Sequence, residues 1–258
     1  AVNPDYSCGT GILSLAQIQT VASGDQDYAM QFNGTSQYAQ TQSTSITSTM
    51  SGAFTVEAWV KPESCANYEN TIMTVDTAFV LSCMNNGNAW RYAIGPGGNW
   101  SGYRDVNTGI PAVLNSWQHL AITRESQSDS IEFYVDGQLA HTEAAWNEAM
   151  GSGFPLVIGH RNGLTDYFHG ELDEVRFYST YRASSIATDM HTYGPTDTTG
   201  LVAYYDFNEG PAGTTGTGTV YNRVSGASSA TNLRTVNSPT YTDVKQTTSN
   251  GNNTVITF

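Results

Sequence analysis

The sequence has few charged residues, and very few of them are positive. Charged side chains make up 13% of the 258 residues, against ~25% in typical globular proteins, and Lys61 and Lys245 are the only lysines. With 23 acidic residues against 10 lysines and arginines, the formal net charge is −13. Because such a chain repels phosphate backbones and anionic membrane surfaces, the composition argues against nucleic acid as a partner.

Long apolar runs and paired cysteine motifs are also missing. No stretch of 18 apolar residues occurs, which argues against insertion into a membrane, and no Cys-x-x-Cys pair points to a zinc or redox site. Cys65 and Cys83 flank a predicted hairpin, and we expect them to form a disulfide. Cys8 is left over, either free or paired outside this chain. A disulfide would indicate an oxidising, extracellular compartment.

Common catalytic motifs are absent as well. The five histidines are scattered, and the chain has neither a Gly-x-Ser-x-Gly elbow nor a His-Glu-x-x-His zinc motif. No glycine-rich loop of the phosphate-binding kind precedes a helix pattern. We therefore expect a chain that is not an enzyme.

What the sequence does have is short strand patterns along most of its length. In 54–61 the residues alternate cleanly between two faces. Asp136-Gly137 lies between two strand patterns, which is a strong hairpin signal. The expected strands are 28–32, 54–61, 78–83, 89–94, 116–123, 130–135, 155–159, 172–178 and 201–207. One short helix is expected in 183–191, so the pattern predicts an all-β antiparallel β-sandwich or jelly roll.

The domain organisation follows from composition. We assign 1–195 to one sandwich and expect the strands of 196–244 to complete it, although they could instead begin another module. Residues 245–258 are expected to start a linker or a next module. We interpret the chain as a piece of a longer secreted protein, in which it is a monomeric module.

Five segments occur in an order that points to one family. They are 28–34, 54–62, 117–121, 133–137 and 170–178. Together they resemble the bacterial laminin-G-like (concanavalin A-like lectin/glucanase) domains, over about residues 25–192. The resemblance implies a jelly roll of two antiparallel sheets and a frequent calcium site at its rim. Function varies within the family, so the fold does not by itself assign one.

The resemblance places the calcium site between two segments of the chain. The residues implied are Asn33, the Gly34 carbonyl, Ser36 and Gln37 after the first strand, and Asp173 on a later one. Oxygen ligands of this kind suit Ca²⁺. The alternative is that Asn33-Gly34 is a simple turn and that Asp173 bonds to backbone.

A possible glucanase motif lies in the same later strand. In Glu171-Leu-Asp173-Glu-Val175 the residues 171, 173 and 175 would share one face, and Glu174 would point the other way. The glucanase relatives carry a third acid where this chain has Val175. Glycan cleavage is therefore weaker than binding as a hypothesis.

Aromatic residues with polar neighbours mark a candidate ligand face. Sugars stack on aromatic rings and hydrogen-bond to polar side chains, so we expect ligand contacts from Trp100, Tyr103, Arg104, Asn99, Arg91, Tyr92 and Arg161, with Asn162 beside the last. The alternative is that many of these residues pack in the core or across strands.

The sequence thus predicts an extracellular or cell-surface, calcium-dependent binding or adhesion module. Its partner would be a carbohydrate or a cell-surface or matrix protein. The alternatives are a ligand-free structural spacer and, with less support, a glycan-cleaving enzyme.

Overall fold

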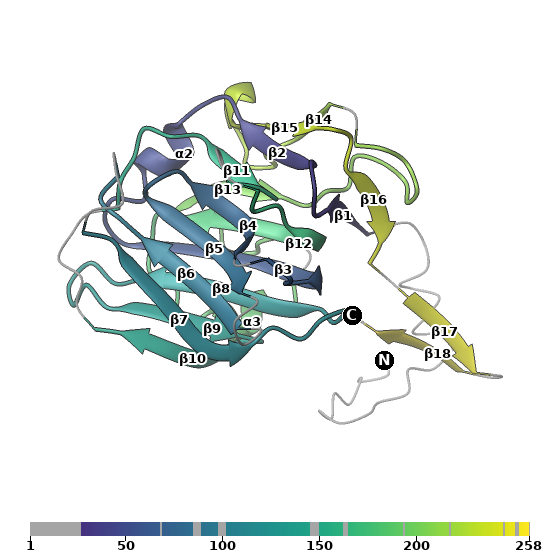
Figure 1. Ribbon diagram of the computed structural model, residues 1–258, viewed down its shortest axis with the longest axis horizontal. Coiled ribbons are helices and arrows are strands. Elements are labelled where there is room, and N and C mark those ends of the chain that lie inside the picture. Colours follow the sequence, from purple (N-terminus) through teal and green to yellow (C-terminus); the bar gives the residue numbers. More distant parts are fainter. Residues whose placement is uncertain are drawn as a thin grey trace, which may run out of the picture.

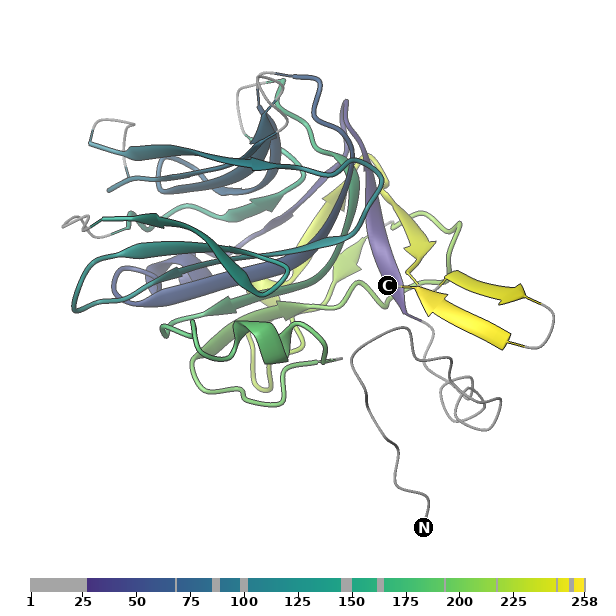
Figure 2. The same ribbon diagram turned by 90° about the horizontal axis from the view of Figure 1, so that it is seen from below.

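The computed structural model describes residues 27–257 except 68, 85–88, 98–101, 145–149, 162–164, 193, 217, 245 and 251–252. The strands form two antiparallel eight-stranded sheets. Figures 1 and 2 show that the two sheets pack face to face. This confirms the predicted all-β sandwich. No helix in the described part of the chain is both long and apolar enough to cross a membrane.

The first sheet, here called sheet A, has the order β10-β9-β8-β3-β12-β1-β16, and β13 pairs with the far half of β12. Its strands are β1 (Tyr28–Asn33), β3 (Phe54–Ser64), β8 (Gln118–Arg124), β9 (Ile131–Val135), β10 (Gln138–Glu143), β12 (His169–Tyr178), β13 (Leu201–Tyr205) and β16 (Thr240–Asp243). Asp136 and Gly137 form the expected hairpin between β9 and β10, with φ of 50° and 73°.

The second sheet, sheet B, has the order β14-β15-β2-β11-β4-β5-β6-β7. Its strands are β2 (Tyr38–Thr41), β4 (Asn70–Val75), β5 (Phe79–Met84), β6 (Ala89–Ile94), β7 (Arg104–Pro111), β11 (Leu156–Ile158), β14 (Thr219–Val220) and β15 (Leu233–Val236). β17 (Gln246–Asn250) and β18 (Asn253–Thr257) pair with each other as a separate hairpin. Strands formed after residue 200 therefore hydrogen-bond into both sheets.

Within the part of the chain that the structure describes, three short helical segments join the strands: α2 (Ser45–Ser48), α3 (Ile186–Asp189) and the 3₁₀ turn η1 (Ser229–Thr231). α3 lies inside the predicted helix of 183–191 but is shorter. The sequence pattern did not predict α2, whose Ser and Thr residues favour turns and caps more than helix interiors.

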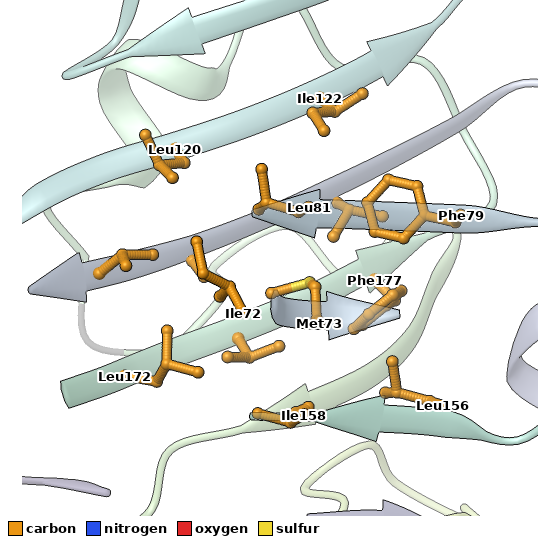
Figure 3. Close-up of a cluster of buried hydrophobic side chains, with 14 of the residues drawn as sticks. Ile72, Met73, Phe79, Leu81, Leu120, Ile122, Leu156, Ile158, Leu172 and Phe177 are labelled. Atoms are coloured by element: carbon orange, nitrogen blue, oxygen red, sulfur yellow. The ribbon is translucent and has the colours of Figure 1, made fainter. Parts of the chain in front are cut away.

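Inward-facing side chains of both sheets form one apolar core. Figure 3 shows part of it, in which residues of β4, β5 and β11 meet residues of β8 and β12. The predicted disulfide is present: Cys65 and Cys83 are joined with an S–S distance of 2.01 Å, and both are buried against this core. The bond ties the end of the β3 segment in sheet A to β5 in sheet B.

β12 departs from regular alternation in its middle. Three residues of β12 span two of β3 there, because Asp173 pairs with Trp59 and Arg176 with Glu57, and Glu174 has φ of 51°. This β-bulge turns Val175 into the core. The expectation that 171, 173 and 175 share a face, with Glu174 on the other, is therefore wrong. The sequence contains a sign of this bulge. The core-facing apolar residues 172, 175 and 177 are spaced by three and then by two, whereas a regular strand would space them by two throughout.

A non-strand segment covers the outer face of sheet A. Residues 179–200 include α3, and Figure 2 shows this green segment beneath the lower sheet. Side chains of the sheet fasten it: Trp59 donates Nε1 to the Met190 carbonyl at 3.0 Å, and Arg176 donates to the carbonyls of Asp189 and Thr192. Outward-facing residues of β3, β8 and β12 are buried beneath this cover.

Candidate functional site

A pocket opens where this cover ends. It has a volume of about 190 Å³ and is lined by Asp27, Trp59, Trp117, Asp173, Glu174, Met190, His191, Thr192 and Val244. We call it the tryptophan pocket. A space of this size holds about six waters at ~30 Å³ each, which matches one sugar ring or another small group.

Strand pairing brings the main side chains of the pocket together. Trp59 on β3 faces outward, in the alternation that buries Val56, Ala58 and Val60. Its cross-strand partner on β12 is Asp173. On the other side, Trp59 pairs with His119 on β8, and Trp117 is the residue just before β8 begins, two positions before His119. The two indoles and the carboxylate thus come from two neighbouring strands and the segment that leads into a third.

Asp173 is the most deeply buried acid of the pocket, with 2% of its surface exposed. Its Oδ1 accepts the backbone N–H of Glu174 at 2.7 Å. Burial raises the pKa of Asp173 well above its ordinary value, and the charges of Asp27, Glu174 and Asp206 add to that rise. The charged side chains that raise the pKa of Asp173 are therefore all acidic.

Glu174 differs from Asp173 although both line the pocket. Its carboxylate accepts from Arg176 Nη2 and from the hydroxyl of Tyr204 at 2.5 Å. Arg176 also lies with its guanidinium carbon 5.6 Å from the Tyr204 ring centroid. The charge of Glu174 is thus neutralised within the protein.

A buried titratable pair lies next to the pocket on the same face. Burial raises the pKa of Glu57 to about 7, and burial with the nearby Arg176 lowers the pKa of His119 to about 3. His119 Nε2 and Glu57 Oε2 are 3.5 Å apart. Around neutral pH this corresponds to a neutral histidine beside a carboxyl group that readily takes up a proton.

The residues expected to hold calcium do not come together. β1 pairs with β12 so that Asn33 lies opposite His169, four residues before Asp173, or about 13 Å along the strand. Asn33 Oδ1 instead accepts the backbone N–H groups of Thr35, Ser36 and Gln37 at 3.0 to 3.3 Å. This arrangement matches the simple turn of the alternative interpretation.

The Asn33 turn has further contacts of its own. Gly34 donates its N–H to the Phe168 carbonyl, and Gln37 Nε2 donates to the carbonyls of Asn237 and Ser238. Across the described residues, no group of three or more His, Cys, Asp or Glu is arranged to hold a metal ion. The expected ligand set therefore does not fit a calcium ion as one site.

The predicted ligand face is divided by the structure. Arg91 Nη1 donates to Glu69 Oε1 at 2.7 Å, Arg91 Nε donates to Asp105 Oδ1 at 2.6 Å, and Arg161 Nη1 donates to Glu69 Oε2 at 3.0 Å. We call these four residues the arginine cluster. Arg91 and Arg161, both predicted to contact a ligand, thus bind the same carboxylate, that of Glu69, which the sequence analysis did not single out.

The remaining predicted ligand residues fare differently. Tyr92 is fully buried and stacks on Phe133 at 5.9 Å between centroids, so it is a core residue and its assignment to a ligand face is wrong. Its place in the alternation of 89–94 already indicated an inward face. Tyr103 and Arg104 are exposed at the start of β7. Asn99, Trp100 and Asn162 lie outside the described residues, as does Cys8.

The acids of the possible glucanase motif are engaged elsewhere. Glu171 accepts from Lys61 Nζ at 2.8 Å and from the Thr242 hydroxyl at 2.7 Å. Val175 points into the core and Asp173 into the tryptophan pocket. The motif therefore does not form a set of carboxylates around one space.

Comparisons with solved structures agree with this fold. A proposed carbohydrate binding protein from Bacteroides ovatus matches with a TM-score of 0.61 and 21% identity, over 85% of this chain and 60% of that one. This chain thus spans less than two thirds of that protein, and at such identity the likeness concerns the fold alone.

More distant matches include a heptameric SAP-like pentraxin from Limulus polyphemus (TM-score 0.48, 16% identity, 64% of this chain and 83% of that one). Domain 4 of the extracellular arabinanase AbnA from Geobacillus stearothermophilus, solved with arabinotriose, has a TM-score of 0.47 and 19% identity over 64% and 81%. Curated protein sequences gave no match. A laminin-G-like family model matches residues 33–185, more than half of the chain, and the chain therefore belongs to the concanavalin A-like lectin/glucanase superfamily.

Proposed function

We propose that this chain is an extracellular, non-enzymatic carbohydrate-binding module that takes its ligand in the tryptophan pocket. The observation that carries the proposal is the pocket itself, in which two half-buried indoles border a buried aspartate. A sugar ring presents an apolar face to stack on an indole and hydroxyl groups to donate to a carboxylate. Pockets of mixed apolar and polar lining are the general pattern for small ligands.

The wall of the pocket is preorganised for such a ligand. The Trp59 indole is fixed by its hydrogen bond to the Met190 carbonyl and by edge packing on His119, with ring centroids 5.3 Å apart. Trp117 lies below the ammonium group of Lys61, which is 6.0 Å from its ring centroid. A rigid wall loses little conformational entropy when a ligand binds.

Other observations support a binding role over a catalytic one, and an extracellular one over a cytosolic one. Glycoside hydrolysis requires a pair of carboxylates, and Glu171 of the glucanase-like motif is instead engaged by Lys61 and Thr242. The Cys65–Cys83 disulfide suits an oxidising compartment. Adhesion through surface glycans would follow from binding of this kind.

A glycan array followed by titration calorimetry tests the proposal. We expect Trp117→Ala to weaken binding of the best array ligand about tenfold or more, as loss of a stacked aromatic anchor usually does. Tyr103→Ala is the matched control, because Tyr103 is an exposed aromatic residue of the predicted ligand face on sheet B. A loss with Tyr103→Ala alone would move the site to that face, and a protein that binds no glycan would favour the structural spacer.

A further inference from the structure

Asp173 is short of partners for a buried carboxylate. Apart from the Glu174 N–H on Oδ1, no hydrogen bond or ion pair reaches it within the described part of the chain. The charges that act on it come from Asp27, Glu174 and Asp206, all of them acidic. A buried charge normally has a partner of opposite sign, because its desolvation is otherwise costly.

The nearby arginine and lysine side chains are paired with other acids. Arg176 pairs with Glu174, Lys61 with Glu171, and Arg223 with Asp206 at 2.9 Å. Among the described residues, these pairs leave Asp173 without an arginine or lysine partner. Because the raised pKa of Asp173 disfavours its charged form, a bound cation would favour ionisation of this carboxyl group. The net charge of −13 adds a long-range attraction for cations.

Most of the rest of the wall is apolar or aromatic, and Asp27, Glu174, His191 and Thr192 complete the lining. Trp59, Trp117, Met190 and Val244 form most of the surface around the carboxylate. Indole faces attract cations through their quadrupole, and they also cover the carbon skeleton of an organic ligand. A calcium ion takes six to eight oxygen ligands, and among the described residues no group of three or more His, Cys, Asp or Glu is arranged to hold a metal ion.

We propose that the tryptophan pocket selects ligands that carry a protonated amine, so that within the proposed function its preferred glycans contain amino sugars with a free amino group. The ammonium group would donate to Asp173, and the sugar ring would lie against the indoles. The inference rests on the proposed carbohydrate binding, and it adds the class of sugar.

Paired oligosaccharides test it by calorimetry: glucosamine oligomers against their fully N-acetylated counterparts, at a pH where the amine is protonated. N-acetylation removes the charge and keeps the ring, so we expect wild-type protein to bind the free amine at least tenfold more tightly. Asp173→Asn should abolish the preference. Asparagine can still accept the Glu174 N–H, so this variant keeps the local backbone contact.

Glu63→Gln is the matched control, since Glu63 is a partly exposed acid on the same sheet and outside the pocket. It removes the same charge and should leave the preference intact. A preference lost equally in both variants would indicate general attraction to an acidic surface and overturn the inference.

Three further results would also overturn it. Equal or tighter binding of the N-acetylated oligomer would do so while leaving the proposed function in place, as would binding confined to neutral glycans on the array. Calcium binding that depends on Asp173 would assign the carboxylate to a metal instead. The absence of binding to any glycan would refute the proposed function itself.

Discussion

The tryptophan pocket and the arginine cluster both place charged groups on the outer face of a sheet, but they differ in charge balance. In the arginine cluster, Arg91 and Arg161 meet Glu69 and Asp105, so the positive and negative groups satisfy one another. In the tryptophan pocket, Asp173 faces indoles and other acids. The difference teaches that aromatic and charged residues close together in the sequence do not by themselves mark a ligand site, because in the arginine cluster the charges pair with one another.

The largest effect is expected from breaking the arginine cluster. Arg91→Met leaves the buried Glu69 without its closest cation, and removal of one partner of a buried pair costs about 3 kcal/mol. For a chain of this size we expect the melting temperature to fall by roughly 6–12 °C. Arg104→Met, at an exposed arginine on β7, should have little effect. Glycan affinity below the melting temperature should stay unchanged, and its loss would show that the cluster binds ligand.

The pH dependence of stability is the next largest effect, and it concerns the Glu57–His119 pair beside the pocket. Between pH 4.5 and 6.5 the folded state holds one proton on Glu57, whose pKa is about 7, and none on His119, whose pKa is about 3. The unfolded state holds one proton on the histidine and none on the glutamate. The proton counts match, so this pair contributes no slope in that range.

Glu57→Gln removes that balance. The unfolded variant still takes up a proton on His119 and the folded variant does not, so its stability should rise with pH relative to wild type. The expected rise is roughly 2–3 kcal/mol between pH 4.5 and 6.5. Urea denaturation of both proteins at several pH values measures the difference between their free energies of unfolding. The contributions of the other carboxylates are the same in both proteins and cancel in this difference. A constant difference would mean that Glu57 is ionised throughout.

A smaller difference in stability is expected between variants of the two indoles of the pocket. Trp59→Phe removes the hydrogen bond to the Met190 carbonyl and should cost about 1 kcal/mol of stability. No such bond ties Trp117 within the described residues, so Trp117→Phe should cost less. Chemical denaturation measures both variants. Equal costs would show that the cover over sheet A is held by other contacts.

The smallest effect is expected from calcium. Because neither the Asn33 turn nor the pocket presents a ligand set that fits this ion, calcium should change the free energy of unfolding by less than about 1 kcal/mol, which is a shift of a few degrees at most. Thermal unfolding with calcium and with a chelator measures this. A larger shift that Asp173→Asn abolishes would restore the calcium-dependent module predicted from the sequence.

The sequence by itself determined the class of fold, since period-two alternation in segments such as 54–61 requires one buried and one outer face. It also determined the Asp136-Gly137 hairpin and the pairing of Cys65 with Cys83, which depend on local turn chemistry and on two cysteines that flank one hairpin. The alternation also placed Trp59 on the outer face, but it did not show that Trp59 lines a pocket.

The tertiary structure alone decided which outer-face residues become neighbours. Asp173 lies beside Trp59 because β12 pairs with β3 in one register, and Arg91 meets Glu69 because β6 and the segment before β4 converge on one face. Such contacts join residues 22 to 114 positions apart, and local sequence patterns carry no information on them. Register and long-range pairing thus decided that Arg91 meets acidic partners, while Asp173 has no arginine or lysine partner among the described residues.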